Sequence, residues 1–283
     1  MPISLSWRSV SLAALALLAA ARWASADPLR VATVSTVLTE FATTIGGPDA
    51  QVLGLIRPGV DPHTFEPSPR DLTAVRDYDL ILAAGLDVDP SLVKAVTHTG
   101  GKAEWINLSL NPDPHWWNSV VAAEGIVRRL TAELQRRKPE AQSGFAVRSA
   151  ALLGRLSRLD FTSRQQLNEI PPRRRVLITT HDAFAWFARD YGFQVYSLAG
   201  VNAEAEPSAR DVARVVDEIR RAGVTTLFFE SAANPHLVSA LAEETGAKAG
   251  GTLYADGLSP DGDGATYAGM IRHNISTLVD GLK

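Results

Sequence analysis

Cysteine is absent from the 283 residues of this sequence. The chain can therefore form no disulfide bond, and its stability must come from its core. It also contains no Cys-x-x-Cys motif for a metal and no cysteine that could carry an N-terminal lipid. We therefore expect a soluble protein without a lipid anchor.

A strong excess of charge of either sign is absent as well. The sequence has 28 Lys and Arg residues against 31 Asp and Glu residues, and its formal net charge is −3. No basic block interrupts this balance. The composition therefore gives no electrostatic reason to expect nucleic acid or anionic lipid as a partner.

Long apolar runs are missing except for one at the N-terminus. Arg8 precedes the uncharged segment 10–21 (VSLAALALLAAA), and the tripeptide Ala-Ser-Ala follows at 24–26. This order is typical of a secretory signal peptide, and the run is too short for an ordinary transmembrane helix. We predict that residues 1–26 are removed on export and that the mature protein is located in a bacterial periplasm.

The remainder of the chain alternates β-rich runs with helical patterns, which indicates βα units and mainly parallel sheets. The clearest strands are expected at 29–35, 79–83, 175–180 and 225–230. Helices are expected at 38–45, 183–191 and 235–244. Each of these helices is followed by a glycine that can end it. The sequence therefore predicts an α/β fold.

The segment between the two halves has a different pattern. From about 140 to 170, apolar residues recur near helical spacing among many arginines. Pro139 suits the start of a helix there, and Pro171-Pro172 suits its end. We predict a long helix at 140–170 that joins an N-terminal lobe at 27–139 to a C-terminal lobe at 171–283. An ordinary helix inside one larger sheet domain is the alternative.

Two of the six histidines follow the same dipeptide, Asp-Pro. His63 lies in GVDPHTFEPSP (59–69) among three prolines, and His115 lies in NPDPHWW (111–117) beside two tryptophans. A rigid loop can hold an imidazole at the fixed angle that a tight metal site requires, and neighbouring indoles would exclude water. Each loop could instead be a surface turn or the start of a helix with an incidental histidine.

His181 and Asp256 lie at corners where a ligand could also bind. His181 directly follows the strand predicted at 175–180, and open α/β sheets bind ligands outside the carboxyl ends of their strands. Asp256 follows the apolar segment of GTLYADGL (251–258), although Asp-Gly is also a common turn. No pair of these residues has the close spacing of a zincin motif, so spacing alone does not establish a site.

The order of these motifs resembles that of the zinc and manganese solute-binding proteins of bacterial ABC importers. The resemblance covers essentially the whole mature chain. It rests on GVDPHTFEPSPRDL (59–72), DPHWW (113–117), TTHDAFAWFARDYG (179–192) and LYADGL (253–258). That family has two α/β lobes joined by a long, rather rigid helix, with one metal ion in the cleft between the lobes. The resemblance implies the same architecture and a metal cargo here.

The resemblance assigns the role of metal ligand to four residues of this chain: His63, His115, His181 and Asp256. Manganese-type members typically have a glutamate where this chain has His181. Three imidazoles and one carboxylate suit tetrahedral Zn(II), whereas Mn(II) prefers more oxygen ligands. Zn(II) is therefore the favoured cargo, and Mn(II) is the alternative because Asp256 could bind through both oxygens.

Other residues near these motifs are not assigned as metal ligands. Glu66 and Glu230 are candidates to accept hydrogen bonds from ligand imidazoles. The segment 107–112 lacks the histidine-rich loop that zinc-type relatives often carry, and Asn118-Ser119 stands where the family usually has Asp-Pro. The remaining histidines match no ligand position, and we expect surface or helix-packing roles for them: His98, His236 and His273.

Four protein ligands would leave Zn(II) no open position for a reactive water, so the resemblance implies a binding protein and not an enzyme. A secreted zinc hydrolase with Asp256 as its base is one alternative, and a surface adhesin is another. The expected partners are an ABC permease in the inner membrane and its cytoplasmic ATPase. A periplasmic metallochaperone is a further candidate partner, and the protein itself is expected to be a monomer.

Overall fold

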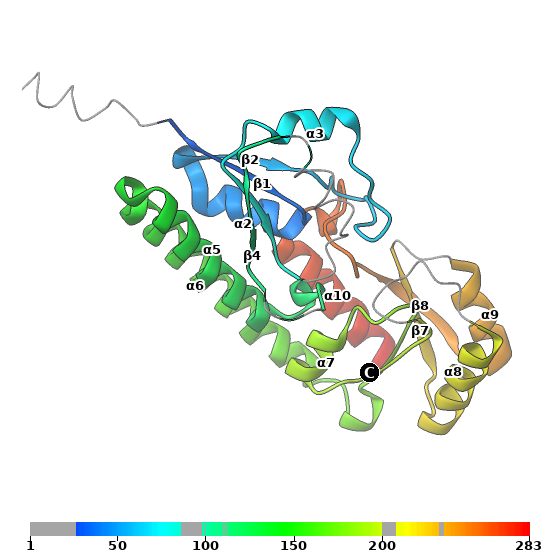
Figure 1. Ribbon diagram of the computed structural model, residues 1–283. Helices are drawn as coiled ribbons and strands as arrows, with labels where there is room; N and C mark the ends of the chain where they lie inside the picture. Colours follow the sequence, from blue (N-terminus) through cyan, green and yellow to red (C-terminus); the bar gives the residue numbers. More distant parts are fainter. Residues whose placement is uncertain are drawn as a thin grey trace, which may run out of the picture.

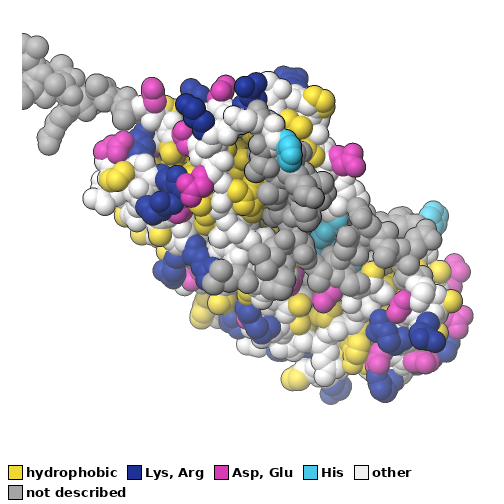
Figure 2. Space-filling view, in the orientation of Figure 1, with side chains coloured by type: hydrophobic (Ala, Val, Ile, Leu, Met, Phe, Trp, Pro, Cys, Tyr) yellow, Lys and Arg dark blue, Asp and Glu magenta, His cyan; other side chains and the backbone are white. Residues whose placement is uncertain are grey.

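The computed structural model describes residues 27–85, 98, 100–109, 111, 113–199, 208–231 and 235–283. The predicted signal peptide at 1–26 lies outside these residues. No helix in the described part of the chain is long and apolar enough to cross a membrane. On the face shown in Figure 2, the coloured basic and acidic side chains are interspersed over the surface.

The N-terminal half contains a parallel sheet in the order β2-β1-β3-β4. Its strands are β1 (Leu29–Thr33), β2 (Ala50–Gly54), β3 (Leu80–Ala83) and β4 (Glu104–Asn107). The helical segments of this half are α2 (Thr36–Gly46), η2 (Gly47–Asp49), α3 (Pro69–Val75) and η3 (Trp116–Asn118). As predicted, α2 ends at a glycine pair, and Gly47 has a φ of +52° that favours glycine.

Two long helices lie side by side along one side of the molecule (Figure 1). They are α5 (Val120–Arg137) and α6 (Gln142–Leu167), joined through the short turn η4 (Pro139–Ala141). The predicted long helix is therefore present as α6. It begins after Pro139 and not at it, because the proline belongs to η4. Ser119 starts α5, since its hydroxyl accepts a hydrogen bond from the backbone N–H of Ala122.

The described part of the C-terminal half contains two parallel strand pairs. These are β5 (Val176–Thr179) with β6 (Gln194–Ser197), and β7 (Thr226–Glu230) with β8 (Lys248–Leu253). The helical segments are η5 (Pro172–Arg174), α7 (Ala185–Tyr191), α8 (Ala209–Ala222), α9 (Pro235–Thr245), η6 (Asp263–Ala265) and α10 (Tyr267–Leu282). The α/β class, the parallel sheets and the two lobes agree with the prediction. The exact boundaries at 139 and 171 stay predictions.

The strands that the sequence predicted are mostly buried, and those it did not predict are their more exposed partners. In the four-stranded sheet, β1 and β3 are central, whereas β2 and β4 are edges. All four residues of β3 are buried, but no residue of β2 or β4 is. A strand buried on both faces needs a continuous apolar run, whereas an edge strand does not. The outer strands therefore lack the pattern that identifies a strand.

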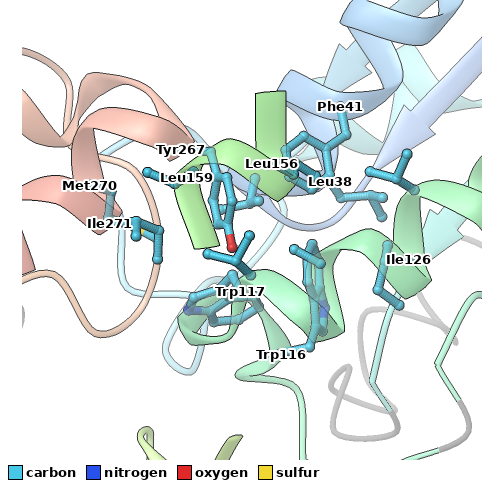
Figure 3. Close-up of a cluster of buried hydrophobic side chains, with 14 of the residues drawn as sticks. Leu38, Phe41, Trp116, Trp117, Ile126, Leu156, Leu159, Tyr267, Met270 and Ile271 are labelled. Atoms are coloured by element: carbon cyan, nitrogen blue, oxygen red, sulfur yellow. The ribbon is translucent and has the colours of Figure 1, made fainter. Parts of the chain in front are cut away.

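The largest core cluster lies under the loop that follows His115. Figure 3 shows the indoles of Trp116 and Trp117 packed among side chains of α2, α6 and α10. Trp116 is fully buried, and its Nε1 donates to the Ala84 carbonyl at 2.8 Å. The cluster joins residues on both sides of α6 in the sequence. This core therefore fixes the His115 loop against both halves of the chain.

Candidate metal site

Four side chains from four separate loops meet at one point, and we call them the metal cluster: His63, His115, His181 and Asp256. One donor atom from each lies within 4.8 Å of all the others. The Nε2 atoms of His63 and His115 are 3.1 Å apart. Asp256 Oδ1 lies 3.0 Å from the Nε2 of His181 and 3.5 Å from the Nε2 of each other imidazole. The structure thus brings together the four residues that the sequence singled out.

These separations match the size of a divalent transition-metal ion. A tetrahedral Zn(II) with bonds of about 2.0–2.1 Å needs donor atoms roughly 3.3–3.4 Å apart. Four of the six donor pairs in the metal cluster are 3.0–3.5 Å apart, on both sides of that value, and all six lie within 4.8 Å. All three imidazoles present Nε2, which leaves each Nδ1 for a second contact. The cluster can therefore hold one ion through three nitrogens and one oxygen.

His63 comes from the loop between β2 and α3. Its backbone N–H donates to Asp61 Oδ1 at 2.8 Å, which closes a tight Asx turn. The backbone N–H of Gly59 donates to the Leu258 carbonyl at 2.8 Å, so this loop is joined to the chain just after Asp256. The imidazole is 8% exposed. The loop thus points His63 into the cluster while its own surface stays partly open.

His115 repeats the same turn in a more enclosed place. Asp113 Oδ1 accepts from the His115 backbone N–H at 2.9 Å and also lies 2.8 Å from Nδ1 of the ring. His115 is fully buried, and the Trp117 ring meets it edge-on at 5.4 Å. Burial alone would lower the pKa of His115, but hydrogen bonds to Asp113 and Asp256 outweigh it and raise that pKa.

His181 follows β5 and is held by the end of β7. Its Nδ1 lies 2.8 Å from Glu230 Oε2. The Glu230 carboxylate also accepts from the backbone N–H and the hydroxyl of Thr180, at 2.5 and 2.7 Å. Burial lowers the pKa of His181, yet Asp256 and Glu230 raise it to about 10 overall. Glu230 therefore orients the ring, in the place where the sequence suggested an acceptor.

Asp256 supplies the only negative charge in the metal cluster. Burial raises the pKa of its carboxyl group, but hydrogen bonds with the three imidazoles outweigh this effect and hold that pKa well below its usual range. The carboxylate therefore stays ionised, while the pKa of His181 favours a proton on the facing ring. A metal cation can take the place of that proton, since it offers the carboxylate the same kind of positive partner.

The other residues that the sequence analysis singled out lie outside the metal cluster. Glu66 is exposed, and no hydrogen bond joins it to an imidazole among the described residues. The acceptor that the sequence reasoning missed is Asp113, whose signal was its position two residues before His115. His98 and His236 are exposed, and His273 Nε2 lies 2.8 Å from the Thr252 carbonyl. These three histidines take no part in the metal cluster.

The chain is similar over most of its length to known metal-binding proteins. The family model described as zinc-uptake complex component A, periplasmic, matches residues 31–281. The manganese-binding lipoprotein MntA of Bacillus subtilis (strain 168) is 31% identical over 280 residues, which is 92% of each chain. The zinc-binding protein TroA of Treponema pallidum (strain Nichols) is 32% identical over 278 residues, covering 92% of this chain and 90% of that protein.

Solved structures share the same arrangement. The periplasmic zinc-binding protein TroA of Treponema pallidum superposes with a TM-score of 0.81 at 30% identity, covering 91% of this chain and 99% of that one. A manganese-bound periplasmic metal-binding protein of Candidatus Liberibacter asiaticus gives a TM-score of 0.83 at 22% identity, covering 90% of this chain and 99% of that one. The second likeness concerns the fold alone.

Proposed function

Since this chain belongs to the periplasmic zinc-uptake component A family of metal-binding proteins, we propose that it captures Zn(II) and delivers it to an ABC importer. The observation that carries this proposal is the metal cluster, with three Nε2 atoms and one carboxylate oxygen facing one point. Zn(II) is bound there as cargo. His63, His115, His181 and Asp256 are the proposed ligands.

The choice of metal rests on the donor set. The relatives carry names that refer to manganese, zinc or iron, so family membership leaves the choice of metal open. Three imidazole nitrogens with one carboxylate form the borderline-soft set that Zn(II) prefers, whereas Mn(II) favours oxygen ligands and higher coordination. The cluster offers one oxygen-bearing side chain. We therefore favour Zn(II) over Mn(II).

A binding role fits the position of Asp256 better than hydrolysis does. A catalytic zinc site keeps one position open for water, with its base held nearby. Asp256 Oδ1 lies 3.0–3.5 Å from all three Nε2 atoms, which is the separation expected of a fourth ligand. Asp256→Ala separates the two functions. A binding protein loses affinity in this variant, whereas a hydrolase keeps its metal and loses turnover.

Delivery requires partners that the chain itself does not supply. Solute-binding proteins of ABC importers work with a permease and its ATPase, and we propose the same pair here. A periplasmic metallochaperone that loads the protein, and a monomeric state, remain our predictions. Location outside the cytoplasm follows from the family. The expected lack of a lipid anchor rests on the absence of cysteine, while some relatives are named lipoproteins.

Competitive metal binding to chelator-stripped protein tests this function. The Trp117 ring against His115 provides a fluorescence signal for the metal cluster. We expect one tight Zn(II) per chain, much weaker Mn(II), and a sharp loss of Zn(II) affinity in His181→Ala. His181→Glu should shift the preference toward Mn(II), because it replaces a nitrogen by carboxylate oxygens. Tighter Mn(II) than Zn(II) in the unmodified protein would overturn the choice of metal, and no tight site for either ion would overturn the function.

A further inference from the structure

One buried side chain joins three of the four loops that form the metal cluster. Asn118 is the last residue of η3 and is 1% exposed. Its Nδ2 donates to the Ala183 carbonyl and to the Ala255 carbonyl, both at 2.9 Å. Ala183 comes two residues after His181, and Ala255 comes directly before Asp256. A single amide group therefore connects segments that lie 65 and 137 residues away in the sequence.

Trp117 adds a third hydrogen bond at the point where these segments meet, which we call the junction. Its Nε1 donates to the Ala255 carbonyl at 2.7 Å, so this carbonyl accepts from two consecutive side chains. Both alanines are fully buried, and the indole is 3% exposed. Water therefore has little access to these bonds, which makes a lost partner costly.

We propose that Asn118 is a positioning residue, whose side-chain amide holds the His115, His181 and Asp256 segments in register for metal binding. The inference rests on the proposed function, since it concerns how the same ion is held. None of the bonds involves a ligand atom of the metal cluster. The junction can therefore fix three ligands relative to one another without occupying any of their donor positions.

The chemistry of the junction requires an amide. Both partners of Asn118 are carbonyl oxygens, which only accept hydrogen bonds, and an amide NH2 group offers two donors in one plane. A carboxylate of the same shape would offer acceptors only. The amide oxygen of Asn118 is buried and has no hydrogen-bond partner among the described residues. The junction therefore uses both donors of the amide and does not need its oxygen.

Asn118→Leu tests the proposal, because leucine keeps a similar volume and removes both donors. We expect Zn(II) affinity to fall about 10-fold, as for other residues that orient metal ligands. The bound Co(II) complex should also change its visible absorption, since misplaced ligands distort tetrahedral coordination. Trp117→Phe keeps an aromatic ring and removes one donor, so it should produce the same changes to a smaller extent. It also serves as the test variant if Asn118→Leu does not fold.

Thr226→Val is the matched control for a purely structural effect. Thr226 starts β7, at the other end of the strand from Glu230, and its hydroxyl donates to the Gly281 carbonyl at 2.8 Å. This control should lower the melting temperature and leave Zn(II) affinity and the Co(II) spectrum unchanged. If Asn118→Leu and Trp117→Phe behave in the same way as Thr226→Val, the positioning role is wrong. If the unmodified protein binds neither Zn(II) nor Co(II) tightly, the proposed function itself has failed.

Discussion

The two Asp-Pro-His loops have the same tripeptide and the same turn, but their surroundings differ. In each loop the aspartate Oδ1 accepts from the histidine backbone N–H, at 2.8 Å for His63 and 2.9 Å for His115. Asp113 also contacts the ring of its histidine, whereas Asp61 makes no such contact in the described structure. His115 is fully buried on the central core, and the His63 ring retains 8% exposure.

This difference indicates two kinds of ligand in one site. His115 belongs to a fixed unit, because Asp113 orients its ring and the Trp116-Trp117-Asn118 segment is anchored on both halves of the chain. His63 is positioned mainly by its own turn and by the bond from Gly59 to Leu258. We infer that the buried loop sets the geometry of the site and that the His63 loop completes it.

Removal of each histidine should give the largest effects and the clearest contrast. If the binding free energy of structural zinc is divided among four ligands, each ligand contributes about 3 kcal/mol. Loss of one ligand should therefore lower Zn(II) affinity roughly 100-fold to 1000-fold. We expect His115→Ala to lose at least as much affinity as His63→Ala. Only His115→Ala should also lower the stability of the metal-free protein, by about 1–3 kcal/mol, because it leaves a buried void and removes the ring nitrogen that contacts Asp113.

Isothermal titration with Zn(II) and denaturant unfolding measure these two quantities. His273→Ala is the control, since His273 contacts the Thr252 carbonyl and not the metal cluster. Equal destabilisation by His63→Ala and His115→Ala would contradict the distinction between a fixed and a completing loop.

Substitution of Asp61 and of Asp113, the aspartates that close the two turns, should change Zn(II) affinity less than removal of a histidine does. Asparagine keeps an oxygen that can close the Asx turn but carries no charge to hold the ring N–H. Asp113→Asn is therefore expected to weaken Zn(II) binding about 10-fold, whereas Asp61→Asn should change it less than about threefold. Competition with a chromophoric chelator resolves differences of this size.

Glu66→Gln provides a second comparison on the His63 loop. Its carboxylate is exposed and makes no hydrogen bond to an imidazole among the described residues, so we expect no change in affinity. A loss as large as that of Asp113→Asn would mean that Glu66 does orient a ligand.

A small expected effect is a change with pH in the stabilisation that Zn(II) provides. The pKa values of His115 and His181 are raised, so protonation of these rings stabilises the metal-free fold. This stabilisation is fully present below the unfolded pKa of about 6.5. For His181 it is lost as the pH rises toward about 10. Zn(II) must displace those protons, so it competes better as pH rises. The increase in melting temperature on adding Zn(II) should therefore grow from about pH 6 to about pH 8.

Differential scanning calorimetry with and without Zn(II) measures this change. Asp113→Asn should reduce its dependence on pH, because Asp113 is one cause of the raised pKa of His115. A Zn(II)-dependent shift that is constant across this range would show that no proton is displaced from the imidazoles.

Much of the fold could be predicted from the sequence, and the exceptions share a cause. The strands β1, β3, β5 and β7 were predicted because they are mostly buried, and burial on both faces requires a continuous apolar run. Their partners β2, β4, β6 and β8 were not predicted, since they are largely half-buried or exposed and their composition is mixed. Such strands form because a neighbouring strand offers hydrogen bonds. The residue pattern of one segment does not show which strand lies beside it in the fold.

The sequence by itself determined the local parts of the site. Proline and aspartate before each histidine fixed the two turns, and the side chains fixed the donor types, nitrogen or oxygen. Only the tertiary structure decided that Asp113 and Glu230 orient the rings while Glu66 does not, and that Asn118 joins three loops. These contacts link residues that are far apart along the chain or differ only in which way a side chain faces. Their formation depends on the packing of the whole core, which no short segment encodes.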